Sequence, residues 1–272
     1  MFFKKIVSLS VIPVIIFIVY FFSDNATESL TNTKVLFIGN SYTYRNNMPH
    51  IFEEISKSKG KKVEVEHCTL GKATLYIQSK RPKVFQYIRR QNWDVIVIQG
   101  SSRDFLADSS TLADTTKPAL EKLIKAVQRH NPATKMLFYM TWGYKNGYKP
   151  IEEVNSFEKM ADKIRDQYLS LYKTYNIGVV PVGMAWKDVR RDRADVKLYV
   201  KDGAHPSLKG SYLAASCFYA AIFGESPIGA TYYSKLGPKI CAYLQGRATR
   251  NVLYQEKTYG LPVMQEITRK QF

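Results

Sequence analysis

Cysteine is scarce in this 272-residue chain, and its copies lack the spacing of a structural or metal-binding motif. The three are Cys68, Cys217 and Cys241. Because the number is odd and no Cys-x-x-Cys pair occurs, we expect neither a disulfide framework nor a zinc cluster, although one pair remains free to bridge outside the cytoplasm. Histidine is also sparse, and its four copies are His50, His67, His130 and His205. They do not have metal-ligand spacing, so we expect no metal centre.

Acidic residues are few as well, with 23 Asp and Glu against 40 Lys and Arg and a formal net charge of +17. Only Lys4 and Lys5 of these cations precede residue 24, so the body of the chain is itself basic. A positive electrostatic potential can hold a protein near anionic lipid headgroups, favour binding of acidic polysaccharide, or simply keep the protein soluble. The sequence leaves these three roles open. The cations are spread along the chain without a recognised binding motif, so we expect no nucleic-acid partner.

Charge is missing altogether from one long apolar run, Ile6 to Phe22, which follows Lys4 and Lys5. The run is close to the roughly 17 residues that a membrane-spanning helix needs, and it is apolar on all sides, unlike a buried amphipathic helix. Residues 1–24 are therefore predicted to be a signal peptide or signal anchor. No small-x-small cleavage site follows Phe22, which favours the anchor. The two lysines place the amino terminus in the cytoplasm and the rest of the chain outside, either membrane-anchored or secreted.

Short apolar runs rich in β-branched residues alternate with segments of helical spacing, as in a parallel sheet covered by helices on both faces. The predicted strands are 35–38, 63–65, 95–98, 136–140 and 177–182. The predicted helices are 48–58, 83–90, 118–130 and 154–175, followed by a helix that Pro206-Ser207 opens. We expect one domain over residues 32–224. The sequence pattern of residues 225–272 gives weaker signals of secondary structure, with one predicted helix near 235–252. We expect these residues to form an extension that packs on the domain.

Two distant motifs carry groups that activate a hydroxyl. The first predicted strand runs directly into Gly39-Asn40-Ser41, and Asp202-Gly203-Ala204-His205 lies far downstream. A serine hydroxyl becomes a good nucleophile when a base removes its proton and a carboxylate orients that base. Ser41 also follows the carboxyl end of a strand, where open α/β sheets place their chemistry. The two motifs together predict a serine hydrolase.

The Gly-x-Ser-x-Gly elbow is absent, and so are the Walker and Gly-x-Gly-x-x-Gly phosphate loops. The Gly-Asn-Ser turn, Gly71 after the second strand and the Asp-x-x-His motif instead resemble the blocks of the SGNH, or GDSL-like, hydrolase superfamily, over 34–223. The resemblance implies a three-layer α/β/α sandwich with a central, mostly parallel, five-stranded sheet of the SGNH/flavodoxin-like kind. It also implies that Ser41 is the nucleophile, His205 the general base and Asp202 the carboxylate that orients His205.

An oxyanion hole follows from the same resemblance, because acyl transfer passes through a negatively charged tetrahedral intermediate. The expected donors are the backbone N–H groups of Ser41 and Gly71 and a side-chain amide after the third strand. The family's asparagine is missing there, and Gln99 carries the same amide on one more methylene. The Val-Ile-Gln-Gly-Ser-Ser segment resembles a subgroup that uses glutamine at this place. If Gln99 points into the sheet, Ser101 or Ser102 is the alternative donor.

Two aromatic residues are predicted to contact substrate. Trp142 follows the fourth strand and Tyr42 follows the nucleophile, so both are placed to form an acyl or sugar wall, with packing at the sheet edge as the alternative for Trp142. The predicted function is an extracytoplasmic serine ester hydrolase that acts on acylated carbohydrate, or secondarily on lipid esters, without a cofactor. A non-catalytic glycan-binding protein and an O-acyltransferase remain alternatives on the same scaffold.

Overall fold

The computed structural model describes residues 32–106 and 112–261. The predicted signal or anchor segment, residues 1–24, lies outside these ranges, as do residues 262–272 of the predicted extension. Within the described ranges, no helix is both long enough and apolar enough to cross a bilayer.

Five parallel strands form a single sheet in the order β2-β1-β3-β4-β5. The strands are β1 (Thr33–Gly39), β2 (Val63–Thr69), β3 (Val95–Ile98), β4 (Lys135–Tyr139) and β5 (Gly178–Val180). Each contains or overlaps a predicted apolar run. In the register, Ile38 of β1 lies opposite Cys68 of β2 and Ile98 of β3, so the first three strands end at the same level. The loops that follow them therefore meet along one edge of the sheet.

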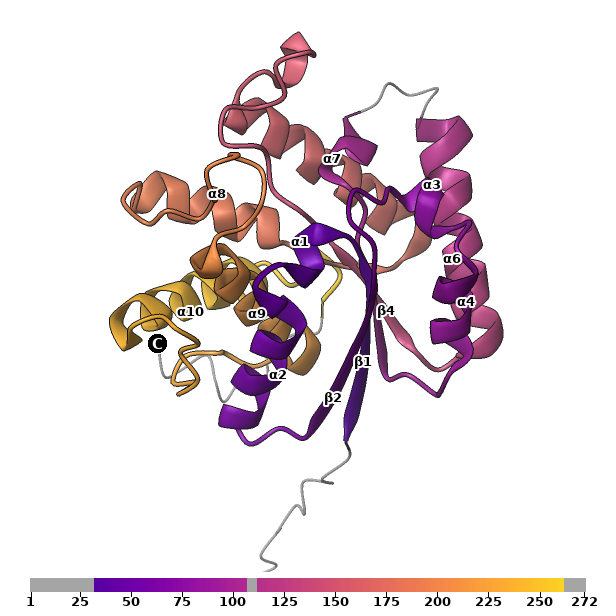
Figure 1. Cartoon of the computed structure of the whole chain (residues 1–272), viewed down its shortest axis with the longest axis horizontal. Coiled ribbons are helices and arrows are strands. Elements are labelled where there is room, and N and C mark those ends of the chain that lie inside the picture. The colour runs from indigo at the N-terminus through magenta and orange to yellow at the C-terminus, as the bar shows by residue number, and fades with distance from the viewer. Residues whose placement is uncertain (1–31, 107–111, 262–272) are drawn as a thin grey trace, which may run out of the picture. The chain divides into compact units, whose positions relative to one another are not determined.

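Helices cover both faces of the sheet, which confirms the three-layer α/β/α architecture (Figure 1). One layer contains α2 (Met48–Ser58), α8 (Val182–Asp192), α9 (Leu208–Phe223) and α10 (Pro238–Leu253). The other contains α4 (Pro82–Arg89), α6 (Lys117–His130) and α7 (Phe157–Tyr175). Short helical segments are α1 (Ser41–Tyr44), η1 (Arg45–Asn47), α3 (Leu75–Gln78), η2 (Ser102–Phe105), η3 (Leu112–Thr116) and η4 (Glu152–Val154). The crossovers place the helix after β1 on one face and those after β2, β3 and β4 on the other, as right-handed connections require.

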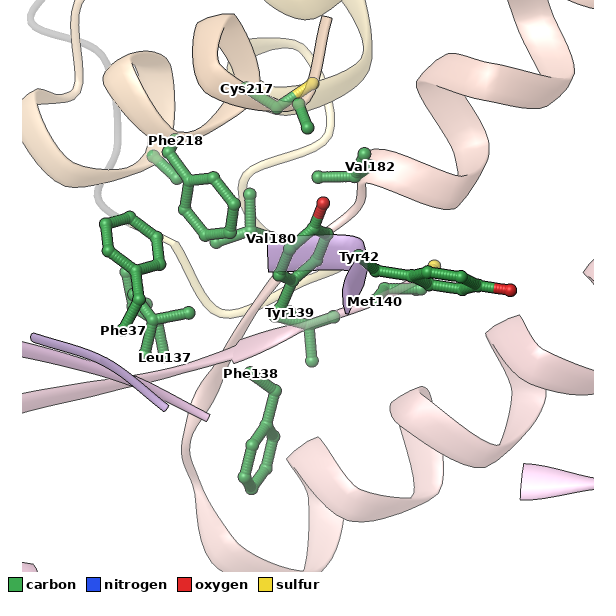
Figure 2. Close-up of a cluster of buried hydrophobic side chains, with 14 of the residues drawn as sticks. Phe37, Tyr42, Leu137, Phe138, Tyr139, Met140, Val180, Val182, Cys217 and Phe218 are labelled. Carbon is green, nitrogen blue, oxygen red and sulfur yellow. The ribbon is translucent and has the colours of Figure 1, made fainter. Parts of the chain in front are cut away.

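Aromatic side chains fill the core between the sheet and the α2/α9 layer. Phe37 of β1 meets Phe218 of α9 edge to face at 5.0 Å and Phe52 of α2 at 5.8 Å. Tyr139 of β4 also packs edge to face on Phe218, with ring centroids 4.8 Å apart. Figure 2 shows the rings of Phe37, Tyr139 and Phe218 on one side of the strands. Phe138 points to the opposite side, as alternation along a strand requires.

The carboxyl-terminal residues complete the helix layer. The residues from Gly210 to Ala221 of α9 are all buried, and α10 packs along this helix. Beyond α10, the backbone carbonyl of Tyr259 accepts a hydrogen bond of 2.8 Å from the N–H of Val179 in β5. The chain thus closes against the β5 edge of the sheet, whereas the β2 edge carries Glu64 and Glu66.

Two predicted boundaries are wrong. The run 177–182 was expected to be a strand, but β5 ends at Val180 and α8 starts at Val182. The first position of this helix follows Pro181, whose side chain forms no capping hydrogen bond, so the usual polar signal of a helix start is absent. The long helix predicted from 154 begins instead at Phe157, after Ser156, whose hydroxyl accepts a hydrogen bond from the N–H of Lys159.

Candidate active site

The Gly39-Asn40-Ser41 turn is held by hydrogen bonds from three sides. The Asn40 side chain caps α1 by accepting from the N–H of Tyr42 at 3.0 Å, and it donates to the carbonyl of Ala73 at 2.9 Å. The backbone N–H of Asn40 donates to the amide oxygen of Gln99 at 2.8 Å. Gly39 makes this close approach possible, because a Cβ there would lie 2.5 Å from that same oxygen. The turn therefore fixes the backbone that carries Ser41.

Three side chains predicted from the two motifs meet in the structure. Ser41 Oγ lies 2.9 Å from His205 Nε2, and His205 Nδ1 lies 2.6 Å from Asp202 Oδ2. Ser41 is nearly buried, whereas the side chains of His205 and Asp202 are 29% and 44% exposed. The hydroxyl, imidazole and carboxylate are thus in line within hydrogen-bond distance, and the imidazole is open to an incoming molecule.

The Asp202–His205 turn also sets the ionisation of its own carboxyl group. Partial burial opposes ionisation of Asp202, but the N–H groups of Ala204 and His205, each 2.9 Å from Oδ1, outweigh it. Together with the His205 ring they lower the pKa of Asp202 to about 2. Asp202 is therefore a carboxylate throughout the neutral range. Gly203 has a φ of +67°, a left-handed conformation that favours glycine and lets the turn fold back on itself.

Trp142 packs in the interior beneath the Asp202–His205 turn, to which it is hydrogen-bonded, and it does not contact the solvent. It has no exposed surface, stacks on Trp186 at 3.8 Å and on Tyr42 at 4.8 Å, and donates from Nε1 to the carbonyl of Ala204 at 2.9 Å. The ring has no exposed face in the structure, which favours the alternative of a packing role. Contact between Trp142 and substrate stays a prediction.

Tyr42 lies on top of this aromatic stack and meets the ring of His205 edge to face at 5.5 Å. Its side chain is 7% exposed, and burial raises its pKa above the ordinary tyrosine value. The described arrangement gives Tyr42 a supporting position beside the imidazole, with little surface for a substrate. Its predicted role as a binding residue stays a prediction.

Two backbone N–H groups are available for an oxyanion. Ser41 is the first residue of α1, so its N–H has no intrahelical acceptor, and Gly71 lies in the loop after β2. Neither N–H forms a hydrogen bond within the described part of the chain. Gly71 also faces Tyr44, whose hydroxyl oxygen would lie 3.1 Å from a Cβ at that position.

The amide of Gln99 has other partners than the predicted oxyanion. It is 1% exposed, its oxygen accepts from the N–H of Asn40 and the hydroxyl of Thr43, and its nitrogen donates to the carbonyl of Gly100. These contacts give Gln99 a structural role beneath the nucleophile turn. Ser102, one alternative donor, is occupied too, with its hydroxyl 2.9 Å from that of Thr141. Oxyanion binding by Gln99 remains a prediction.

Asp104 was not singled out from the sequence, yet it joins the start of α3 to the loop after β3. Its Oδ2 accepts from the N–H of Leu75, the first residue of α3, at 3.0 Å and from the N–H of Ser101, in the loop after β3, at 2.8 Å. Burial raises the pKa of Asp104 to about 6, although these two hydrogen bonds favour the carboxylate. The Ser101-Ser102-Arg103-Asp104 segment is a capping box, a pattern that is visible in the sequence and that could have indicated this residue.

Metal-ligating and thiol groups lie elsewhere. Among the described residues, one cluster has the geometry of metal ligands, formed by His50, Glu53 and Glu54 on α2. Lys57 forms ion pairs with both glutamates, so the cluster already has a cation. The three cysteines are buried free thiols.

The chain belongs to the GDSL-like lipase/acylhydrolase family, whose model matches residues 37–213. That range includes the nucleophile turn and the Asp-x-x-His motif. Among curated proteins, no sequence matches this chain.

Several solved structures share the fold at low sequence identity. A DUF4886 family protein from Bacteroides uniformis is 18% identical, with a TM-score of 0.72 over 88% of this chain and 99% of its own. A putative SGNH hydrolase from Slackia heliotrinireducens is 24% identical, with a TM-score of 0.57 over 71% of this chain and 100% of its own. An acetyl xylan esterase is 19% identical, with a TM-score of 0.52 over 70% of this chain and 99% of its own. The predicted SGNH fold is thereby confirmed.

Proposed function

We propose that this family member is a serine ester hydrolase that uses Ser41, His205 and Asp202. Ser41 Oγ attacks the acyl carbonyl while His205 Nε2 takes its proton, and Asp202 holds the opposite ring nitrogen and stabilises the imidazolium that forms. The backbone N–H groups of Ser41 and Gly71 bind the oxyanion. His205 then returns the proton to the leaving alcohol, which departs and leaves an acyl-serine. Water, deprotonated by the same imidazole, hydrolyses that ester and regenerates Ser41.

The observation that carries this proposal is the unbroken chain of short contacts from hydroxyl to imidazole to carboxylate. An exposed imidazole also suits an ester on a bulky molecule, because such a substrate reaches the serine without entering a deep cavity. We propose O-acyl groups of carbohydrate, acetyl first, as the substrates. The basic charge of the chain supports a polymer that carries anions.

The first test measures hydrolysis of p-nitrophenyl acetate and labelling by a fluorophosphonate. Ser41→Ala and His205→Ala should each abolish turnover, and Ser41→Ala should abolish labelling. Ser170→Ala and His50→Ala are matched controls on exposed helix positions and should keep both. Equal rates in all variants would refute the triad, and a folded protein that is not labelled would favour the glycan-binding alternative.

We also propose that the catalytic domain is extracytoplasmic, because Lys4 and Lys5 precede the apolar run Ile6 to Phe22. Expression with and without residues 1–24, followed by cell fractionation, tests this. The full chain should be exported and the shortened chain should stay in the cytoplasm. Recovery of both in the same compartment would contradict the proposal.

A further inference from the structure

A small pocket lies directly behind the turn that carries Asp202 and His205. Its volume is about 220 Å³, and three cations line it: Lys145, Arg190 and Lys197. The remaining lining residues are apolar or aromatic, and none is acidic.

The walls of this pocket are hydrogen-bonded to the segment that carries Asp202 and His205. The N–H of Lys145 donates to the carbonyl of Gly203 at 2.7 Å, and the N–H of Val200 donates to the carbonyl of His205 at 3.1 Å. Tyr199, which also lines the pocket, forms an isolated bridge with Pro206. A group bound here would therefore lie next to the backbone segment that carries His205.

Arg190 is held in place before any ligand arrives. Its guanidinium stacks on the ring of Phe157 at 3.9 Å and lies 5.4 Å from the ring of Tyr199, and it donates to the carbonyl of Lys145 at 3.2 Å. A guanidinium fixed in this way loses little further entropy when it binds an anion, and its planar donors match a carboxylate.

The three cations of the pocket form no salt bridges within the described ranges, unlike other cations on the nearby helices α8 and α10. Lys187 pairs with Asp162, and Arg247 pairs with Asp188. In contrast, Lys145, Arg190 and Lys197 form no ion pair with any carboxylate of the described residues. Glu158 lines a neighbouring pocket together with Arg190 but is not paired with it. Three cations that line one pocket and form no salt bridge with a described carboxylate make a site that attracts an anion.

We propose that this pocket binds the carboxylate of a uronic acid unit in the substrate polymer. The inference rests on the proposed function and narrows it to esters on acidic polysaccharide. The volume is below the roughly 300 Å³ at which pockets for drug-sized ligands begin, so one charged sugar ring suits it better than a longer segment. The ring of Tyr199 and the side chain of Leu198 offer apolar surface for the C–H face of a sugar, while the cations bind its carboxylate.

Binding is tested separately from catalysis. The full chain carrying Ser41→Ala, purified in mild detergent, is titrated calorimetrically with galacturonate, with neutral galactose and with inorganic phosphate. Galacturonate should bind, galactose should not, and phosphate should bind more weakly. Adding Lys145→Gln or Lys197→Gln should weaken galacturonate binding about tenfold, the usual effect of losing one charge-assisted contact. Lys201→Gln removes the same charge from an exposed lysine outside the lining and should change the affinity less than twofold.

Hydrolysis gives the second readout. With Ser41 intact, Lys145→Gln and Lys197→Gln should lower kcat/KM on acetylated polygalacturonate about tenfold and leave the rates on acetylated xylan and p-nitrophenyl acetate unchanged. Equal loss on all three substrates would overturn the inference, because it would indicate damage to the site itself.

The outcomes separate the two proposals. If galacturonate binds with the expected variant pattern but no ester is cleaved, the pocket assignment holds and the proposed hydrolase fails. If Ser41 cleaves p-nitrophenyl acetate but galacturonate does not bind, the pocket assignment fails alone. Tighter binding of phosphate than of galacturonate would also overturn the sugar-carboxylate assignment.

Discussion

Replacing Asp202 by Asn tests the proposed mechanism most directly, because it removes one charge and changes few contacts. The Asn oxygen can still accept from the N–H groups of Ala204 and His205, so the turn should keep its shape. What is lost is the carboxylate 2.6 Å from His205 Nδ1, which stabilises the imidazolium formed when Ser41 attacks.

Two effects set the size of the loss. At an effective dielectric constant near 20, opposite charges about 4 Å apart attract by about 4 kcal/mol. Since the Asp202 side chain is 44% exposed, solvent screening reduces this to about 2 kcal/mol, or roughly 30-fold in rate. In addition, the Asn NH₂ group donates a hydrogen bond to His205 Nδ1 and so favours the imidazole tautomer with the proton on Nε2. A protonated Nε2 cannot accept the proton of Ser41. Together we expect kcat to fall about 10³-fold, less than the roughly 10⁴-fold loss at a fully buried triad aspartate.

The assay is steady-state hydrolysis of p-nitrophenyl acetate at neutral pH, with circular dichroism to confirm folding. Asp166→Asn, an exposed aspartate of α7 that pairs with Arg165, is the control for loss of one negative charge and should keep the wild-type rate. A folded Asp202→Asn variant that loses less than tenfold in kcat would refute the role assigned to this carboxylate.

Three further substitutions probe the support of the site. Trp142→Phe removes the hydrogen bond to Ala204, so the free energy of unfolding should fall by about 1–3 kcal/mol and kcat should fall too; a raised KM with unchanged thermal stability would instead indicate substrate contact. Gln99→Met leaves two buried donors of the nucleophile turn without an acceptor, so the free energy of unfolding measured in urea should fall by about 2–4 kcal/mol. Unchanged stability would contradict the structural role of Gln99. Asp104, whose pKa is about 6 when folded against about 3.9 unfolded, binds more protons in the folded state between these values, so stability should fall by up to ~3 kcal/mol as pH rises through that window. Asp104→Asn should flatten this part of the pH–stability curve, and a slope identical to that of the wild type would show that another group causes it.

The sheet was predictable because its signals are local. The run Val95 to Ile98 is uniformly apolar and β-branched, and the structure buries it on both faces between β1 and β4. The Gly-Asn-Ser turn was predictable for a related reason, because it directly follows the first strand and parallel strands bring their carboxyl ends to one edge of the sheet. The Asp-x-x-His motif lies between α8 and α9, and its role was predicted from the resemblance to the family.

The features that the sequence did not determine depend on contacts between distant segments. Helix α8 starts without a polar cap, so nothing in its first turn separates it from the preceding strand. The direction of Trp142 is decided by its stacking between Tyr42 and Trp186, three residues far apart in the chain. Gln99 likewise turns its amide toward Asn40, because the backbone N–H of that turn needs an acceptor.

The backbone contact between Val179 and Tyr259 has a consequence for how molecules of this protein behave toward one another. A sheet whose last strand keeps free N–H and C=O groups is a template for pairing with another copy, and such pairing leads to aggregates. The segment around Tyr259 occupies that template from within the same chain, although it lies well past the family match, which ends at residue 213. Shortening the protein to the matched region would therefore remove the cover and leave β5 open to intermolecular strand addition.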